Sequence, residues 1–160
     1  MRIVVAAVGR RKATPEGALI DDYAARVAAG GRMIGIASLD LFESDASRAQ
    51  TVDERRAKEW DELQKFAPDG ARRIILDERG AALTSLAFTE RIRRWRDDGE
   101  PALAFLLGGP DGHPAGAREG ADLVLALGPQ TWPHLLARAM LCEQIYRATT
   151  ILAGRPYHRA

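Results

Sequence analysis

Two turns in the last third of the chain decide the fold: residues 108–112 read Gly-Gly-Pro-Asp-Gly, and residues 128–133 read Gly-Pro-Gln-Thr-Trp-Pro. Each turn directly follows a short apolar run, over residues 102–107 and 123–127. In an open α/β sheet, ligands bind outside the carboxyl ends of the strands. Glycine lets the main chain of such a turn approach a ligand closely. We therefore expect the turns to form the walls of one small-molecule pocket; the alternative is that they are ordinary tight turns.

Outward from these turns, strand and helix patterns alternate five times along the chain. The apolar runs that predict strands cover residues 3–8, 33–41, 73–76, 102–107 and 123–127. The segments that predict helices cover residues 14–28, 51–66, 86–96, 115–119 and 134–152. Thr51 and Glu54 have the spacing of a capping box at the start of the second helix. The alternation predicts one α/β domain over residues 1–160, with a parallel sheet covered by helices on both faces.

Composition and charge narrow the functional class. Of 160 residues, 23 are Lys or Arg and 22 are Asp or Glu, so a net charge of +1 argues against indiscriminate nucleic-acid binding. An RNA contact must come from a local cluster, of which residues 10–12 (Arg-Arg-Lys) are the strongest candidate. The single cysteine, Cys142, has no metal-ligand spacing to any histidine, so we expect no metal. Since no apolar stretch approaches the roughly 18 residues of a membrane span, we expect a cytoplasmic protein.

The common nucleotide-binding signatures are missing from the chain. There is no GxxxxGK[ST] phosphate loop, and no GxGxxG follows the first strand. A dinucleotide or a nucleoside triphosphate is therefore a poor candidate ligand. Turns fixed by proline and opened by glycine favour a nucleoside that is bound through backbone hydrogen bonds.

Three segments after the second turn carry a resemblance to a known family. They read Pro-His-Leu-Leu-Ala-Arg (133–138), Glu-Gln-Ile-Tyr-Arg-Ala (143–148) and Pro-Tyr-His-Arg (156–159). Together with the Gly-Gly-Pro-Asp-Gly turn, they resemble the ribosomal RNA large subunit methyltransferase H family. These small SPOUT enzymes methylate N3 of a pseudouridine in helix 69 of 23S rRNA. The resemblance covers the whole chain and is strongest from residue 106 to the end.

The resemblance implies a fold, a cofactor and an assembly. The implied fold is a parallel-sheet α/β structure with a C-terminal trefoil knot, whereas general topology rules would predict an unknotted sheet. The implied active unit is a homodimer that acts on 23S rRNA helix 69 within the ribosome. The family's S-adenosylmethionine contacts, carried over by position, fall on Leu76, Gly108, Leu127, Gly128, Pro129, Gln130, Thr131 and Trp132.

The candidate catalytic residues are Arg147, Tyr157, His158 and Arg159. The N3–H of uracil is a weak acid, so its removal near neutral pH needs a base or cations that stabilise the anion. His158 is the candidate base, although arginine alone would also serve. Tyr157 is a candidate stacking partner for the target base or its neighbour. The alternative is that residues 157–159 form a frayed tail.

The helix expected over residues 134–152 separates the two candidate sites. About 19 residues at 1.5 Å each carry the chain roughly 28 Å from the cofactor loop. We therefore expect the tail to reach a partner's pocket across a dimer interface that includes Leu136 and Met140. Two further hypotheses remain: a SPOUT methyltransferase for another rRNA or tRNA site, and a non-catalytic RNA- or ribosome-binding module.

Overall fold

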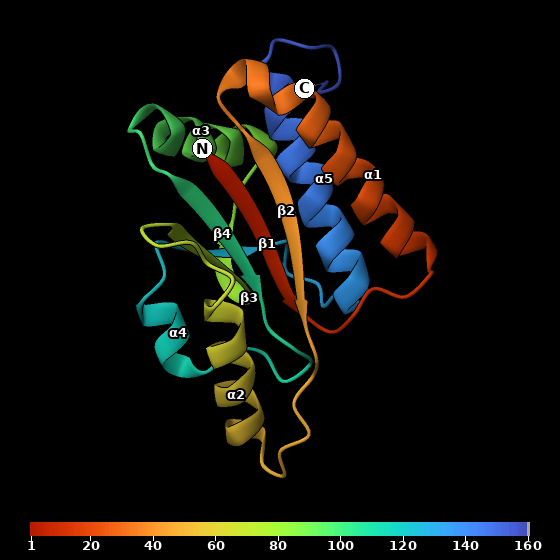
Figure 1. Ribbon diagram of the computed structural model, residues 1–160, viewed down its shortest axis with the longest axis vertical. Coiled ribbons are helices and arrows are strands. Elements are labelled where there is room, and N and C mark those ends of the chain that lie inside the picture. The colour runs from red at the N-terminus through yellow and green to blue at the C-terminus, as the bar shows by residue number, and fades with distance from the viewer. Residues whose placement is uncertain (160) are drawn as a thin grey trace.

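A computed structural model describes residues 1–159 and contains a five-stranded, entirely parallel sheet with the strand order β2-β1-β4-β3-β5 (Figure 1). The strands are β1 (Arg2–Val8), β2 (Ser38–Ser44), β3 (Arg72–Ala82), β4 (Ala102–Leu107) and β5 (Leu123–Ala126). The helices are α1 (Pro15–Gly31), α2 (Val52–Gln64), α3 (Ser85–Asp97), α4 (Ala115–Glu119) and α5 (His134–Leu152). The predicted α/β class and parallel sheet are confirmed.

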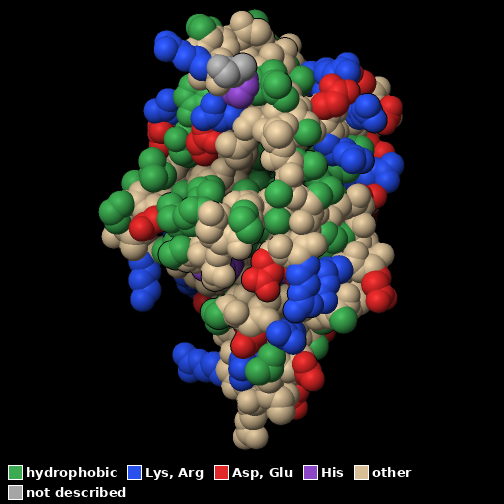
Figure 2. All heavy atoms as spheres, turned by 180° about the vertical axis from the view of Figure 1, so that it is seen from behind, with side chains coloured by type: hydrophobic (Ala, Val, Ile, Leu, Met, Phe, Trp, Pro, Cys, Tyr) green, Lys and Arg blue, Asp and Glu red, His purple; other side chains and the backbone are tan. Residues whose placement is uncertain are grey.

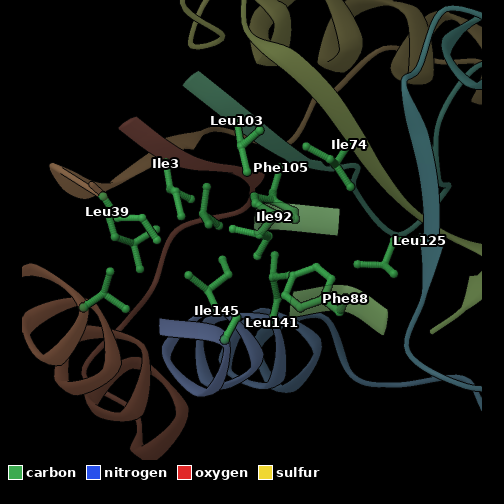
Figure 3. Packing of buried hydrophobic residues seen from close by; sticks show 14 of the residues in the cluster. Ile3, Leu39, Ile74, Phe88, Ile92, Leu103, Phe105, Leu125, Leu141 and Ile145 are labelled. Atoms are coloured by element: carbon green, nitrogen blue, oxygen red, sulfur yellow. The ribbon is translucent and has the colours of Figure 1, made fainter. Parts of the chain in front are cut away.

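The helices cover both faces of the sheet. Alternate residues of β1, including Ile3 and Val5, pack in one core with residues of α1, α3 and α5 (Figure 3). The intervening residues, including Val4 and Ala6, pack in a second core against Leu63 of α2. Because β1 and β4 lie in the middle of the sheet and are covered on both faces, their sequences are nearly uninterrupted apolar runs.

Local sequence signals place several helix starts. Thr14 caps α1 by accepting a hydrogen bond from the Gly17 N–H, and a proline occupies the first helical position. Thr51 accepts a hydrogen bond from the Glu54 N–H, and the Glu54 carboxylate accepts one from the Thr51 N–H. The capping box expected at the start of α2 is therefore confirmed.

The strand expected over residues 33–41 begins later than its apolar pattern indicated. A short 3-10 helix (Arg32–Ile34) extends α1, and Gly35, with φ of 78°, reverses the chain before β2 starts at Ser38. The Ile36 N–H donates to the Gly31 carbonyl oxygen, as in a Schellman cap. The apolar side chains just before β2 therefore belong to a helix end, and the prediction was wrong for this segment.

The strand expected over residues 73–76 is longer than predicted and is interrupted. Leu76 and Ala81 both pair with Leu125 of β5, so residues 77–80 form a bulge between them. Gly80 lies directly against β5, where an added Cβ would be 2.6 Å from the Val124 carbonyl oxygen. A side chain at this position would push the bulge away from the sheet.

The carboxyl ends of β3, β4 and β5 lie side by side at one edge of the sheet. Leu76 pairs with Leu107 on one side and with Leu125 on the other. The bulge and the two glycine-containing turns consequently start from adjacent positions. The C-terminus lies at the opposite end of the molecule from the tips of the strand arrows (Figure 1).

Candidate functional site

A cavity of about 620 Å³ lies where the three loops meet. Both glycine-containing turns line it, as the sequence predicted for a common pocket. Of the residues expected to bind the cofactor, Pro129 belongs to the same loop but does not line the cavity. The others line it, namely Leu76, Gly108, Leu127, Gly128, Gln130, Thr131 and Trp132.

The first turn closes around His113. The Gly108 N–H donates to His113 Nε2 at 3.0 Å, and the Trp60 ring meets the imidazole edge-on at a centroid distance of 5.6 Å. Burial lowers the pKa of His113 to about 4, so the imidazole is neutral near pH 7. Because Nε2 accepts a hydrogen bond, the proton of the neutral ring lies on Nδ1.

Helix α2 holds this turn from behind. Arg55 Nε donates to Asp111 Oδ2 at 2.6 Å, and Arg56 Nε donates to the Asp111 carbonyl oxygen at 2.7 Å. Glu59 is buried against Gly109, where an added Cβ would lie 2.5 Å from Glu59 Oε2. Gly109 is therefore required for the approach of α2. No local pattern predicts this contact, because Glu59 and Gly109 are 50 residues apart in the chain.

The second turn, which carries most of the predicted cofactor contacts, is closed by its own tryptophan. Trp132 Nε1 donates to the Leu127 carbonyl oxygen at 3.1 Å, and Gly128 has a φ of 105°. The Trp132 side chain is 37% exposed at the cavity, so it is not a core residue. Next to it, burial and the nearby Arg138 lower the pKa of His134.

Arg138 fixes the first turns of α5 beneath the sheet. Its guanidinium is 1% exposed and donates to Glu43 Oε1 at 2.6 Å and to the Gly9 carbonyl oxygen at 2.7 Å. These bonds join α5 to the carboxyl ends of β1 and β2. They also hold the helix that follows the second turn.

The same network alters the expectation for the basic residues 10–12. Arg11 pairs with Glu43 at 3.3 Å through its side chain, and its backbone N–H donates to the same carboxylate. Arg10 pairs with Asp45 at 2.6 Å. Within residues 1–159, Lys12 is thus the one member of this cluster without a carboxylate partner. The expectation that this cluster contacts RNA stays a prediction, and an RNA phosphate would compete with Asp45 and Glu43 for the two arginines.

The candidate catalytic residues gather along the second half of α5, because the tail folds back against the helix. Glu143 Oε1 accepts hydrogen bonds from Arg147 Nη2 and from the Tyr157 hydroxyl, the latter at 3.0 Å. Arg147 Nη1 lies 3.4 Å from His158 Nδ1, whereas Arg159 is exposed. Tyr157 and His158 are therefore held against α5 and are not a frayed tail.

We call Glu143, Arg147, Tyr157 and His158 the tail cluster, in which Tyr157 makes contacts with three different side chains. Its ring lies 4.8 Å from that of Tyr146 and 4.9 Å from the Arg147 guanidinium. Burial raises the pKa of Tyr157, and hydrogen bonds with Tyr23 and Glu143 raise it further. Glu143 stands in the 143–148 motif, but neither it nor Tyr23 was a candidate site residue; the i,i+4 spacing of Glu143 and Arg147 was the available signal for the first.

One protomer does not bring the two candidate sites together. The cavity meets α5 at His134 and Ala137, whereas the tail cluster begins at Glu143. A second cavity of about 590 Å³, lined by Met140 and Gln144, shares residues 125–128 with the first. Hydrophobic side chains also gather over the middle of the face seen in Figure 2. A groove along α5 thus leads from the first cavity toward the tail.

Neither a membrane span nor a metal centre is found in the described chain. No helix of residues 1–159 is long and apolar enough to cross a bilayer. The same residues contain no group of three His, Cys, Asp or Glu side chains placed to hold a metal ion. Cys142 is buried, and burial raises the pKa of its thiol to about 12, so it is a poor nucleophile.

Comparison with known proteins decides the family. A family model described as "Predicted SPOUT methyltransferase" matches residues 1–158. The ribosomal RNA large subunit methyltransferase H of Brucella anthropi is 50% identical over 160 residues, covering 100% of both chains. The corresponding proteins of Paracoccus denitrificans (48%, 99% of each chain) and Rhodopseudomonas palustris strain HaA2 (46%, 100% of each chain) are similar.

The chain belongs to the ribosomal RNA large subunit methyltransferase H family. The resemblance seen in its C-terminal motifs is therefore confirmed over the full length. Its fold is the parallel-sheet SPOUT fold, with the C-terminal trefoil knot that this family implies. Membership also explains why α5, which follows an edge strand, begins beneath β1 in the middle of the sheet.

We expect Gly108→Val to weaken cofactor binding by about 1–3 kcal/mol through overpacking of the first turn. A Cβ at residue 108 would lie 3.1 Å from Gly112 and 3.2 Å from His113, so the side chain would enter the turn and not the cavity. Calorimetric titration with S-adenosylmethionine measures the effect. Gly116→Val is the matched control, because a Cβ there meets open space. Unchanged affinity in a folded Gly108→Val protein would remove this turn from the site.

Proposed function

We propose that the protein transfers the methyl group of S-adenosylmethionine to N3 of a pseudouridine in helix 69 of 23S rRNA. Family membership supports methyl transfer to ribosomal RNA. The single observation that carries the cofactor assignment is the cavity on which nearly all the family's cofactor positions converge. Its volume, about 620 Å³, lies within the usual range for small-molecule sites. A ribosomal substrate also agrees with a cytoplasmic protein.

The residues of the cavity fit S-adenosylmethionine. Loop 127–132 and turn 108–113 offer backbone groups and the flat indole of Trp132, which suit a nucleoside. No Cβ narrows the cavity at Gly112 or Gly128, both of which have positive φ. When bound, this cofactor supplies a methyl group on a sulfonium centre. The protein's own task is to position the acceptor nitrogen in line with that group and to manage its proton.

The tail cluster supplies the groups for the proton. Arg147 would stabilise the N3 anion, His158 would accept the proton, and Tyr157 would stack on a base. The tail folds back to Glu143, nine residues or roughly 14 Å along α5 from His134 at the cavity, and we infer that it serves the cavity of a second protomer. The proposed homodimer buries the side of α5 that carries Leu136 and Met140, both of which are half-buried in one protomer.

Mass spectrometry of helix 69 tests the function. We expect the pseudouridine to carry a methyl group in cells that contain this gene and to lack it in a deletion strain, with recovery on complementation. Loss of a methyl group from another rRNA or tRNA position would favour the second hypothesis. A purified protein that binds ribosomes but no S-adenosylmethionine would instead be a non-catalytic RNA-binding module.

A further inference from the structure

Most lysine and arginine side chains of the described residues form an ion pair with a carboxylate, but some do not. Fourteen lysines and arginines of residues 1–159 lie within 4.0 Å of a carboxylate. Three arginines line the first cavity. Arg118 pairs with Asp77 at 2.8 Å, and Arg56 reaches Asp53 at 3.8 Å and the Asp111 carbonyl oxygen. Arg79 is the remaining one, and within the described residues its guanidinium has no partner.

The backbone that carries Arg79 is held firmly although its side chain is exposed. Asp77 Oδ1 accepts a hydrogen bond from the Arg79 N–H at 2.9 Å, and Asp77 Oδ2 accepts one from Arg118. On the other side, Gly80 lies against β5 with no room for a Cβ. The bulge therefore presents the Arg79 guanidinium at the cavity rim from a fixed position.

An exposed arginine beside the cavity is suited to bind a phosphate group of an RNA substrate. Its planar guanidinium donates bidentate hydrogen bonds to phosphate oxygens, and it stays charged at all physiological pH values. Enzymes that modify a base draw the nucleotide into a pocket, which leaves the flanking phosphates at the rim. Glu78 is also exposed at this rim, and its charge opposes phosphate binding.

We propose that Arg79 binds a backbone phosphate next to the nucleotide that enters the cavity, and so positions the RNA substrate. This inference rests on the proposed function. It adds a cation at the cavity itself to the cluster at residues 10–12, whose Arg10 and Arg11 are paired with Asp45 and Glu43. The carboxylate of S-adenosylmethionine is the competing anion, and the experiment separates the two.

The test compares Arg79→Gln with Arg73→Gln. Arg73 is also exposed and has no carboxylate partner in the described chain, but it lies at the amino end of β3, away from both cavities. The probes are S-adenosylmethionine alone and ribosomes purified from a strain that lacks the gene. We expect Arg79→Gln to weaken ribosome binding roughly 3- to 10-fold at low salt. The slope of log K against log salt should fall by about 0.7 to 0.9.

Arg73→Gln should leave ribosome affinity nearly unchanged, and both variants should bind S-adenosylmethionine like the wild type. Glu78→Gln should tighten ribosome binding, since it removes a negative charge from the same bulge. Equal effects of Arg79→Gln and Arg73→Gln, or a loss of S-adenosylmethionine affinity in Arg79→Gln, would overturn the assignment. A wild-type protein that does not bind ribosomes would instead overturn the proposed function and this inference with it.

Discussion

Deletion of the chain after Pro156 should abolish methyl transfer and leave S-adenosylmethionine affinity within about twofold of the wild type. Tyr157 and His158 fold back against α5 and contact Glu143 at its middle and Arg147 one turn further on. They do not line the cavity, so their removal leaves its walls intact. Calorimetry measures cofactor affinity, and transfer of a radioactive methyl group to ribosomes measures activity. A large loss of cofactor affinity in the folded variant would contradict this separation of roles.

Mixed dimers then show which protomer the tail serves. The partner variant is Gly128→Val, which places a branched residue at a φ of 105° and distorts the cofactor loop. Each parent alone should be inactive. Random pairing makes half of the dimers mixed, and each mixed dimer has one intact cavity facing one intact tail, so we expect about a quarter of wild-type activity. Inactive mixtures of parents that fold and pair would show that the tail does not act across the interface.

Stability should fall steeply as the pH drops from 6.5 to 4, because His113 is buried in its neutral form. Its pKa is about 4 in the folded chain against 6.5 for an ordinary histidine. Between these values the unfolded chain binds one proton more than the folded chain does. His113 alone therefore lowers the free energy of unfolding by about 1.4 kcal/mol for each pH unit. The total loss on going from pH 6.5 to pH 4 is about 3 kcal/mol.

The structural cause is the hydrogen bond between Gly108 and His113. A proton on Nε2 would turn the acceptor of the Gly108 N–H into a second donor, and the first turn would open. Urea denaturation of wild type and His113→Gln at several pH values measures the effect. The His113→Gln variant should lose less stability between pH 6.5 and 4. The slope of its unfolding free energy against pH should be smaller by the amount that one bound proton contributes. His134→Gln is a parallel test. The pKa of His134 is also lowered, so this variant should also lose less stability than the wild type as the pH falls. Parallel curves for wild type and His113→Gln would contradict the assignment.

Local sequence determined most of the framework. The uninterrupted apolar runs 3–8 and 102–107 became the two central strands, because only a strand covered on both faces buries every side chain. The Thr51 capping box depends on residues three apart, so the sequence alone specifies it. The two glycine-containing turns could be placed at one sheet edge, because the carboxyl ends of parallel strands always lie together.

Tertiary structure decided which polar groups are available for chemistry. Arg138 and Glu43 are 95 residues apart in the chain, yet they pair, and the half-buried Arg11 contacts the same Glu43 carboxylate. Glu59 requires Gly109 for the same kind of reason, through a contact between α2 and a distant turn. No periodicity reports such contacts.

The sequence by itself thus determined the central strands, the helices, the family motifs and the location of the cavity, but not the start of β2 or the bulge in β3. Only the tertiary structure decided that Arg79 is the cavity arginine with no carboxylate partner among residues 1–159, and that the tail lies on its own α5. The reason is physical: backbone conformation follows from neighbours within a few residues. The charge, burial and reach of a side chain depend on segments that folding brings together.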